Sequence, residues 1–204
     1  MSKKSILILY VSCTIFLVIS STRAESIKVY SNKNYGFSIN IPEDWYVTEV
    51  DQIIEQSNKK VEQSQKLELI KEAGLVVSIS KFSFNQRVDF NPNINISTKK
   101  IEFSPKPNTA QILNYAKQIL LSLVQQKKEL DVREIKFNGV IGVEATYEYQ
   151  LSHNNKNINI FALTNVLIDQ KTNNYFIIVA SCLKEKSNEF EKLFRETVKS
   201  FKLL

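Results

Sequence analysis

The sequence predicts an α+β fold, an α/β/α sandwich whose central, mostly antiparallel sheet is covered by helices on both faces. The first observation behind this prediction is a succession of four strand patterns over residues 130–183, separated by short turns. The second is that two of them, 158–168 and 175–183, are apolar on both faces, so both faces must be covered. The third is a pair of helical apolar stripes, over 108–127 and from about residue 188, which supply that cover.

The stretch from Tyr35 to Trp45 is the predicted anchor of the first half of the chain. Apolar and small or polar residues alternate there, which is typical of a half-buried strand, and the positions expected on one side are Tyr35, Phe37, Ile39 and Ile41. Pro42 ends this strand because it has no N–H for the ladder, and a turn at 43–44 returns Trp45 to the core. Residues 27–31 form a short strand before it.

Residues 51–73 are rich in Gln, Glu, Lys and Ser, which indicates one or two mostly solvated helical segments. Thr48 is a candidate N-cap for this segment, with Asp51 three residues later, and Gly74 is its expected end. Two interpretations stay open: an inert surface insertion, or a mobile flap over a cleft.

A strand is predicted over residues 75–84, and an irregular connection with three prolines follows over 85–107. Inside it, residues 93–97 alternate between polar residues and Ile, which predicts an edge strand. A connection of this length is usually functional or disordered.

Both covering helices have recognisable starts or stripes. Asn108 is the predicted N-cap of the first, paired with Gln111, and its stripe is Ile112, Ala116, Ile119, Leu120, Leu123 and Val124. The stripe of the second helix is Phe190, Leu193, Phe194 and Val198. Between the helices, Asn138-Gly139 predicts a two-residue hairpin turn.

Residues 1–24 have the pattern of a signal peptide. A short basic region precedes an apolar run over 6–19, which is shorter than the roughly 20 residues of a membrane-spanning helix, and Thr22 and Ala24 are the small residues before a cleavage site. An uncleaved anchor is the alternative. In both cases we expect residues 25–204 to form a single domain outside the cytoplasm, periplasmic or secreted.

Removal of the leader changes the charge and the cysteine content. The whole chain of 204 residues carries a net charge of +6, whereas residues 25–204 keep 24 Lys and Arg against 21 Asp and Glu, or +3. Without a basic cluster, this charge gives no reason to expect a nucleic-acid partner, and no membrane contact is expected beyond the leader. Cys13 lacks the surroundings of a lipoprotein signal, so we expect it to be removed with the leader. The exported chain then keeps one cysteine, Cys182, which we expect to be a buried apolar side chain without a disulfide.

Groups that carry catalysis or bind metals are scarce. His153 is the only histidine and lies in a predicted hairpin turn, so the usual zinc and copper ligand sets cannot be assembled. Four glycines, at positions 36, 74, 139 and 142, leave no phosphate-binding loop and no nucleophile elbow. We therefore expect no cofactor, no metal and no enzymatic activity.

The predicted strand 140–151 has one polar face, formed by Glu144, Thr146, Glu148 and Gln150. Along a strand the two carboxylates would lie about 13 Å apart. Paired glycosidase carboxyls are closer, at about 5–9.5 Å, so a solvated or partner-binding face is preferred. The alternative is a carboxylate-dependent hydrolase whose residues come from separate loops.

Several of these stretches resemble the PsbP-like superfamily: residues 35–42 with Trp45, the strands from Lys136 to Cys182, the terminal helix, and Ser200-Phe201-Lys202. That superfamily includes the extrinsic photosystem II protein PsbP, a nuclear Ran-binding factor and many small exported bacterial proteins. The resemblance covers most of residues 27–202. It implies an antiparallel sheet between helices and a non-enzymatic protein that binds other proteins or small apolar ligands. No functional motif of PsbP or of the Ran-binding factor is matched, so no binding residue is carried over.

Partner-binding residues are expected where the predicted packing leaves a segment unused, because loops displayed by a rigid scaffold often carry binding residues. These places are residues 51–74, residues 85–107 and the polar face. The candidate contacts are Phe90 or Phe103 as an aromatic anchor, and Glu144, Thr146 and Glu148 on the polar face. The alternative is that both segments are solvated insertions.

Overall fold

The computed structural model describes the chain in these ranges: residues 28–50, 72–83, 86, 88, 90–103, 107–124, 130–153 and 156–204. The predicted leader, residues 51–71 of the segment predicted to be helical over 51–73, and residues 154–155 of the hairpin turn predicted around His153 lie outside the described residues.

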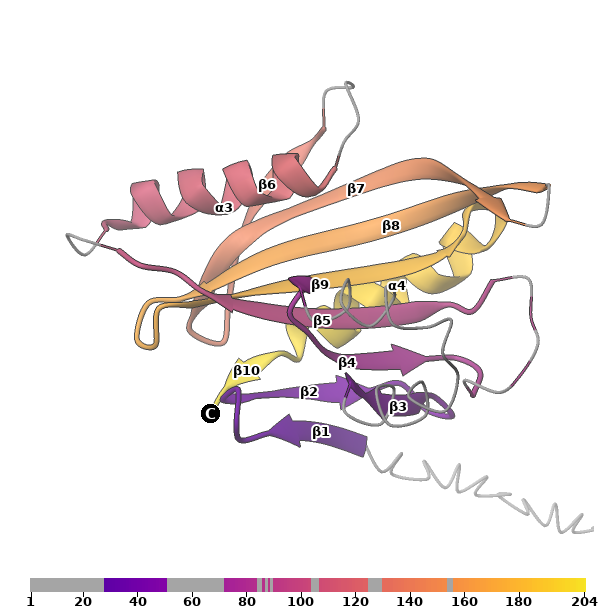
Figure 1. Ribbon diagram of the computed structural model, residues 1–204, viewed down its shortest axis with the longest axis horizontal. Coiled ribbons are helices and arrows are strands. Elements are labelled where there is room, and N and C mark those ends of the chain that lie inside the picture. Colours follow the sequence, from indigo (N-terminus) through magenta and orange to yellow (C-terminus); the bar gives the residue numbers. More distant parts are fainter. Residues whose placement is uncertain are drawn as a thin grey trace, which may run out of the picture.

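A seven-stranded antiparallel sheet forms the centre of the described structure, in the order β3-β4-β5-β9-β8-β7-β6 (Figure 1). Its strands are β3 (Tyr46–Glu49), β4 (Leu75–Ser80), β5 (Asn93–Lys100), β6 (Val132–Phe137), β7 (Val140–His153), β8 (Lys156–Asp169) and β9 (Asn174–Leu183). The four successive strands predicted late in the chain are β6 to β9. Asn138 and Gly139 have φ of 48° and 80°, as a two-residue hairpin turn requires, so that turn is confirmed.

β5 is an interior strand, and the prediction of an edge strand is wrong. It pairs with β4 on one side and with β9 on the other. Ile94 and Ile96 are fully buried on one face. On the other face, Asn95 Nδ2 and Ser181 Oγ both donate to Asn93 Oδ1, at 2.9 and 3.2 Å. The asparagines that suggested an edge are therefore hydrogen-bonded to neighbours within the sheet.

Helices α3 (Thr109–Leu123) and α4 (Ser187–Lys199) cover opposite faces of the sheet, which confirms the predicted sandwich (Figure 1). Their buried residues are Ile112, Ala116 and Leu120 in α3, and Phe190, Phe194 and Val198 among the apolar residues of α4. The predicted cap of α3 is present, because the Asn108 side chain accepts from Gln111 N and the Gln111 side chain accepts from Asn108 N, both at 2.9 Å. Leu123, at the end of the predicted stripe, is 44% exposed and does not pack. A short 3-10 helix, η2 (Lys184–Lys186), leads into α4.

A second sheet of three strands was not predicted. β1 (Lys28–Asn32), β2 (Phe37–Ile41) and β10 (Lys202–Leu203) pair in the order β1-β2-β10. Its buried residues join those of α4 in one apolar cluster, so this sheet and α4 cover the same face of the larger sheet. Between β2 and β3 the chain turns at Pro42, where Trp45 N donates to Pro42 O at 3.2 Å.

The anchor stretch behaves as predicted except at its first residue. Phe37, Ile39 and Ile41 are buried, and Trp45 packs edge-on against Phe190 at 6.1 Å between ring centroids. Tyr35 is 45% exposed, because it lies in the turn between β1 and β2 and precedes the strand.

Thr48 is a residue of β3, so the prediction that it caps a helix is wrong. It pairs with Ser78 of β4 in the ladder. Its neighbours Val47 and Glu49 also pair with β4, so the strand extends through Thr48 to Glu49.

Candidate functional site

The polar face of β7 is partly covered by α4. Glu144 is only 9% exposed and forms an ion pair with Arg195 Nη1. Arg195 Nη2 also contacts Glu191 Oε1 at 2.8 Å, so one guanidinium joins β7 to α4. Burial acts to lower the pKa of Arg195, but the hydrogen bonds that its guanidinium donates to these two carboxylates, together with their negative charges, raise that pKa above its ordinary value. Glu144 therefore has a structural partner, contrary to the assumption that this face has no packing role.

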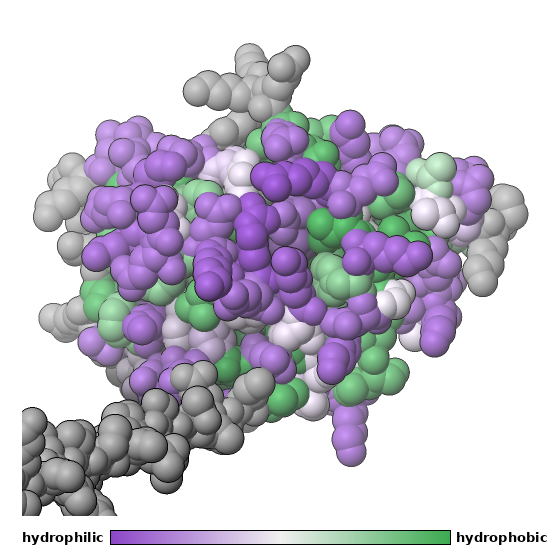
Figure 2. Space-filling model, turned by 180° about the vertical axis from the view of Figure 1, so that it is seen from behind, coloured by the Kyte–Doolittle hydropathy of each residue, from purple (hydrophilic) through white to green (hydrophobic). Residues whose placement is uncertain are grey.

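Farther along the same face, the side chains are more exposed. Glu148 forms an ion pair with Lys184, and Gln150 Nε2 donates to Asn159 Oδ1 at 3.3 Å. Thr146, between the two glutamates, is half-buried. Viewed from the side of α4, hydrophilic residues predominate over the surface (Figure 2). Partner binding by Thr146 and Glu148 stays a prediction.

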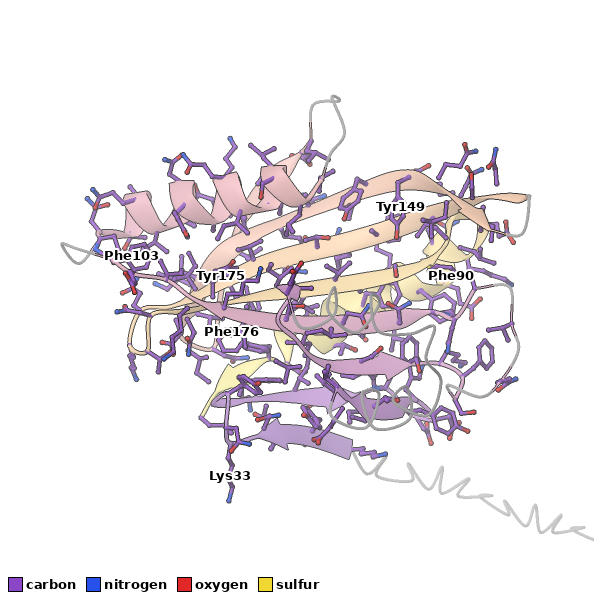
Figure 3. The ribbon with its side chains drawn as sticks, in the orientation of Figure 1. Lys33, Phe90, Phe103, Tyr149, Tyr175 and Phe176 are labelled. Atoms are coloured by element: carbon purple, nitrogen blue, oxygen red, sulfur yellow. The ribbon has the colours of Figure 1, made fainter. Side chains whose placement is uncertain are left out.

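The two aromatic anchor candidates are not brought together. Phe103 and Phe90 lie near opposite ends of the sheet (Figure 3). Phe103 is half-buried and packs edge-on against Tyr115 of α3, with ring centroids 5.6 Å apart. Phe90 is also half-buried. A single small partner cannot use both as one anchor, and Phe103 already helps to hold α3 on the sheet.

The Cys182 thiol and His153 are the other groups that could take part in catalysis or bind a metal ion. Cys182 is fully buried, as predicted, and burial is the main cause that raises the pKa of its thiol to about 11. His153 is the last residue of β7. No three of the His, Cys, Asp and Glu side chains in the described ranges are grouped so that they could hold a metal ion.

None of the helices in the described part of the chain is long and apolar enough to span a membrane.

The state of Cys182 leads to a prediction about pH. Between its ordinary value of 9.0 and about 11, the folded thiol keeps a proton that the unfolded thiol loses. The free energy of unfolding should therefore fall as the pH rises through this window. Chemical denaturation of residues 25–204 at a series of pH values should show this decrease, and Cys182→Ala should show a shallower one. Equal slopes for both proteins would contradict the prediction.

A pocket of about 430 Å³ lies where the β1–β2 turn meets the adjoining ends of β3 and β4. Three separate segments line it among the described residues: Ser31, Asn32, Lys33, Asn34 and Tyr35 from the end of β1 and the turn after it; Glu49 and Val50 at the end of β3; Leu75 and Val76 at the start of β4. Six of these nine side chains are polar and three are apolar. The pocket therefore suits a ligand with both kinds of group.

A chain of hydrogen bonds holds the polar side of this pocket. Asn32 Nδ2 donates to Tyr30 Oη at 2.9 Å, and Tyr30 Oη in turn donates to Glu49 Oε1 at 3.0 Å. Asn32 is fixed by its own Oδ1, which accepts from Tyr35 N at 3.2 Å. Burial is the main cause that raises the pKa of Tyr30 to about 12, so its hydroxyl stays protonated and remains a donor. Glu49 is thus held in a defined orientation at the pocket.

Sequence reasoning did not find Tyr30, Asn32 and Glu49. Asn32 is a polar residue just after the predicted strand 27–31, and Tyr30 and Glu49 are 19 residues apart in the chain. No spacing motif connects residues from β1 and β3, because they meet only when the two sheets pack together. Tyr30 also has an ordinary core contact, a tilted ring contact with Phe37 at 5.9 Å, which gives no sign of a polar role.

Comparison of the sequence with protein families and with curated proteins gives no match. Solved structures do match. Cyanobacterial PsbP (CyanoP) from Synechocystis sp. PCC 6803 aligns with a TM-score of 0.53 at 13% identity, over 87% of this chain and 92% of that chain. LpqN of Mycobacterium tuberculosis, described as involved in cell envelope biogenesis, aligns with a TM-score of 0.49 at 13% identity, over 89% of this chain and 93% of that chain.

The match to cyanobacterial PsbP covers nearly the whole of both chains and establishes the fold. The chain has a PsbP-like fold, as its sequence resemblance implied. At this identity the likeness extends to the fold and to no residue of a site.

Proposed function

We propose that this chain is an exported, non-catalytic binding protein with a PsbP-like fold, and that it holds a small ligand between the β1–β2 turn and the start of β4. The observation that carries the proposal is the pocket of about 430 Å³. Its volume is in the range of small-molecule sites, roughly 300–1,000 Å³. Its mostly polar lining favours a ligand with polar groups over the purely apolar ligand implied by the resemblance. This proposal does not need a protein partner that contacts residues 51–74 or 85–107.

The chemistry of the described residues supports a role without catalysis. A hydrolase that used the carboxylates of the polar face would need Glu144 free to take or give a proton. Glu144 is engaged by Arg195, and breaking such a partly buried pair leaves a charge without its partner. The Cys182 thiol is buried and protonated at neutral pH, so it is no nucleophile.

Export rests on the pattern of residues 1–24. Cell fractionation followed by N-terminal sequencing is the test. The expected product lies outside the cytoplasm and starts at Glu25, after cleavage at Ala24. A cytoplasmic product that starts at Met1 would overturn this part of the proposal.

Ligand binding at the pocket can be tested without knowing the natural ligand. A mixture of small alcohols, sugars, amines and carboxylates is added to isotope-labelled protein, and amide chemical shifts are followed by NMR. The expected shifts are confined to residues 31–35, 49–50 and 75–76. Leu75→Trp should fill the pocket and abolish them, whereas Leu121→Trp, at a site on α3 that is 45% exposed, should leave them unchanged. Shifts that survive in Leu75→Trp, or the absence of any shift at these residues, would contradict the proposal.

A further inference from the structure

The charges at the pocket are unequal, although its lining contains one acid and one base. Glu49 and Lys33 are the only charged residues among its described lining. The Lys33 side chain points away from the body of the molecule, into solvent (Figure 3). Glu49 lies at the junction of β3 and β4 and is half-buried. Among the described lining residues, the charged group held in place at the pocket is therefore the Glu49 carboxylate.

Only one oxygen of Glu49 is used within the described structure. Oε1 accepts from Tyr30 Oη, and no described donor contacts Oε2. No described Lys or Arg forms an ion pair with this carboxylate either. A carboxylate oxygen that is oriented by a neutral donor and lacks a cation is a suitable acceptor for a charged N–H donor from a ligand.

The apolar part of the lining lies beside this carboxylate. Val50 follows Glu49 directly in the chain, and Val77, the residue after Val76, pairs with Glu49 in the β3–β4 ladder. Leu75, Val76 and Val50 are thus the apolar residues of the described lining, in the segments next to Glu49. Burial of a short hydrocarbon chain against these residues would favour binding, because it removes apolar surface from water.

We propose that the pocket binds a small organic cation, an alkylamine whose ammonium group contacts Glu49 and whose hydrocarbon chain lies on Val50, Leu75 and Val76. This inference rests on the proposed function and assigns a ligand class to the same pocket. Tyr30 is a positioning residue in this arrangement, because its hydroxyl already donates to Glu49 and is supported by Asn32. A ligand with a carboxylate in the same place would be repelled by Glu49.

Three probes of equal chain length test the assignment: hexylamine, hexan-1-ol and hexanoate. Each is titrated into labelled protein, and the shifts of residues 31–35, 49–50 and 75–76 give the Kd. Hexylamine should bind at least tenfold more tightly than hexan-1-ol, and hexanoate should not bind. The affinity of the protein for hexylamine should fall as salt is added, because salt screens the attraction between charges at a partly exposed site.

Two conservative variants and one control locate the effect. Glu49→Gln keeps the size of the side chain and an acceptor for Tyr30, and it should weaken hexylamine binding about tenfold or more while leaving hexan-1-ol unchanged. Tyr30→Phe should weaken hexylamine binding by a smaller factor. Glu43→Gln removes an exposed acid outside the pocket and should change neither.

The outcomes separate this inference from the proposed function. If hexylamine and hexan-1-ol shift the pocket residues with equal Kd, the cation assignment is wrong and the proposed function stands. If hexylamine binds equally well to Glu49→Gln, the assignment is wrong as well. If none of the three probes, nor the earlier mixture, shifts the pocket residues, the proposed function itself is wrong.

Discussion

Phe37→Ala is expected to lower the free energy of unfolding by about 3–5 kcal/mol, the usual cost of truncating a fully buried Phe. Phe37 has no exposed surface, and its ring contacts three other aromatic rings: Tyr30 at 5.9 Å, Phe176 at 5.6 Å and Phe201 at 5.4 Å. These rings come from β1, β9 and the residue before β10. The substitution therefore removes contacts that join the small sheet to the large one.

Chemical denaturation of residues 25–204 measures this effect. Phe37→Leu keeps much of the buried volume and should cost clearly less than the alanine variant. Tyr35→Ala, two residues earlier and 45% exposed, should change the stability by about 0.5 kcal/mol or less, as surface substitutions do. A cost below about 1 kcal/mol for Phe37→Ala would show that the cluster does not join the two sheets.

Gly142→Ala should be destabilising by about 3 kcal/mol or more, at the upper end for overpacked sites. A Cβ at this position would lie 2.1 Å from Val166 O and 3.0 Å from Leu167 Cα. Both atoms belong to the backbone of β8, so no side-chain rotation relieves the clash. β7 and β8 would have to separate near the β6–β7 turn, where Gly142 pairs with Leu167.

Gly36→Ala is the matched control for this variant. A Cβ at Gly36 meets no atom within 4 Å, but the residue has a φ of +69°. Its cost is then only the strain of the left-handed conformation, about 1–2 kcal/mol. Denaturation curves should place Gly142→Ala clearly below Gly36→Ala in stability. Equal stabilities would contradict the steric argument.

Elements defined by local patterns were predictable from the sequence. The cap formed by Asn108 and Gln111, the turn at Asn138-Gly139 and the apolar stripe of α4 each depend on residues close together in the chain. Local side-chain chemistry and periodicity determine such features. The fold class followed because two strands apolar on both faces require two covering layers.

Features that depend on distant residues were not predictable. The place of β5 inside the sheet depends on its pairing with β9, about 80 residues later. The ion pair between Glu144 and Arg195 joins residues 51 positions apart, and without it Glu144 resembles any exposed strand acid. For the pocket, the contact of Tyr30 with Glu49 forms only when the two sheets pack. The candidate site was therefore less predictable than the fold.

The pairing of β2 with β10 imposes an order on how the protein is made. Leu204 N donates to Gly36 O at 2.9 Å, and Asn40 N donates to Ser200 Oγ at 2.8 Å, 160 residues apart in the chain. During synthesis or vectorial transport, β1 and β2 emerge long before residues 200–204. Until those residues arrive, β2 lacks its second neighbour and Phe37 lacks the stacked ring of Phe201. Because contacts this distant close late in folding, the small sheet is completed only after residues 200–204 have been synthesised.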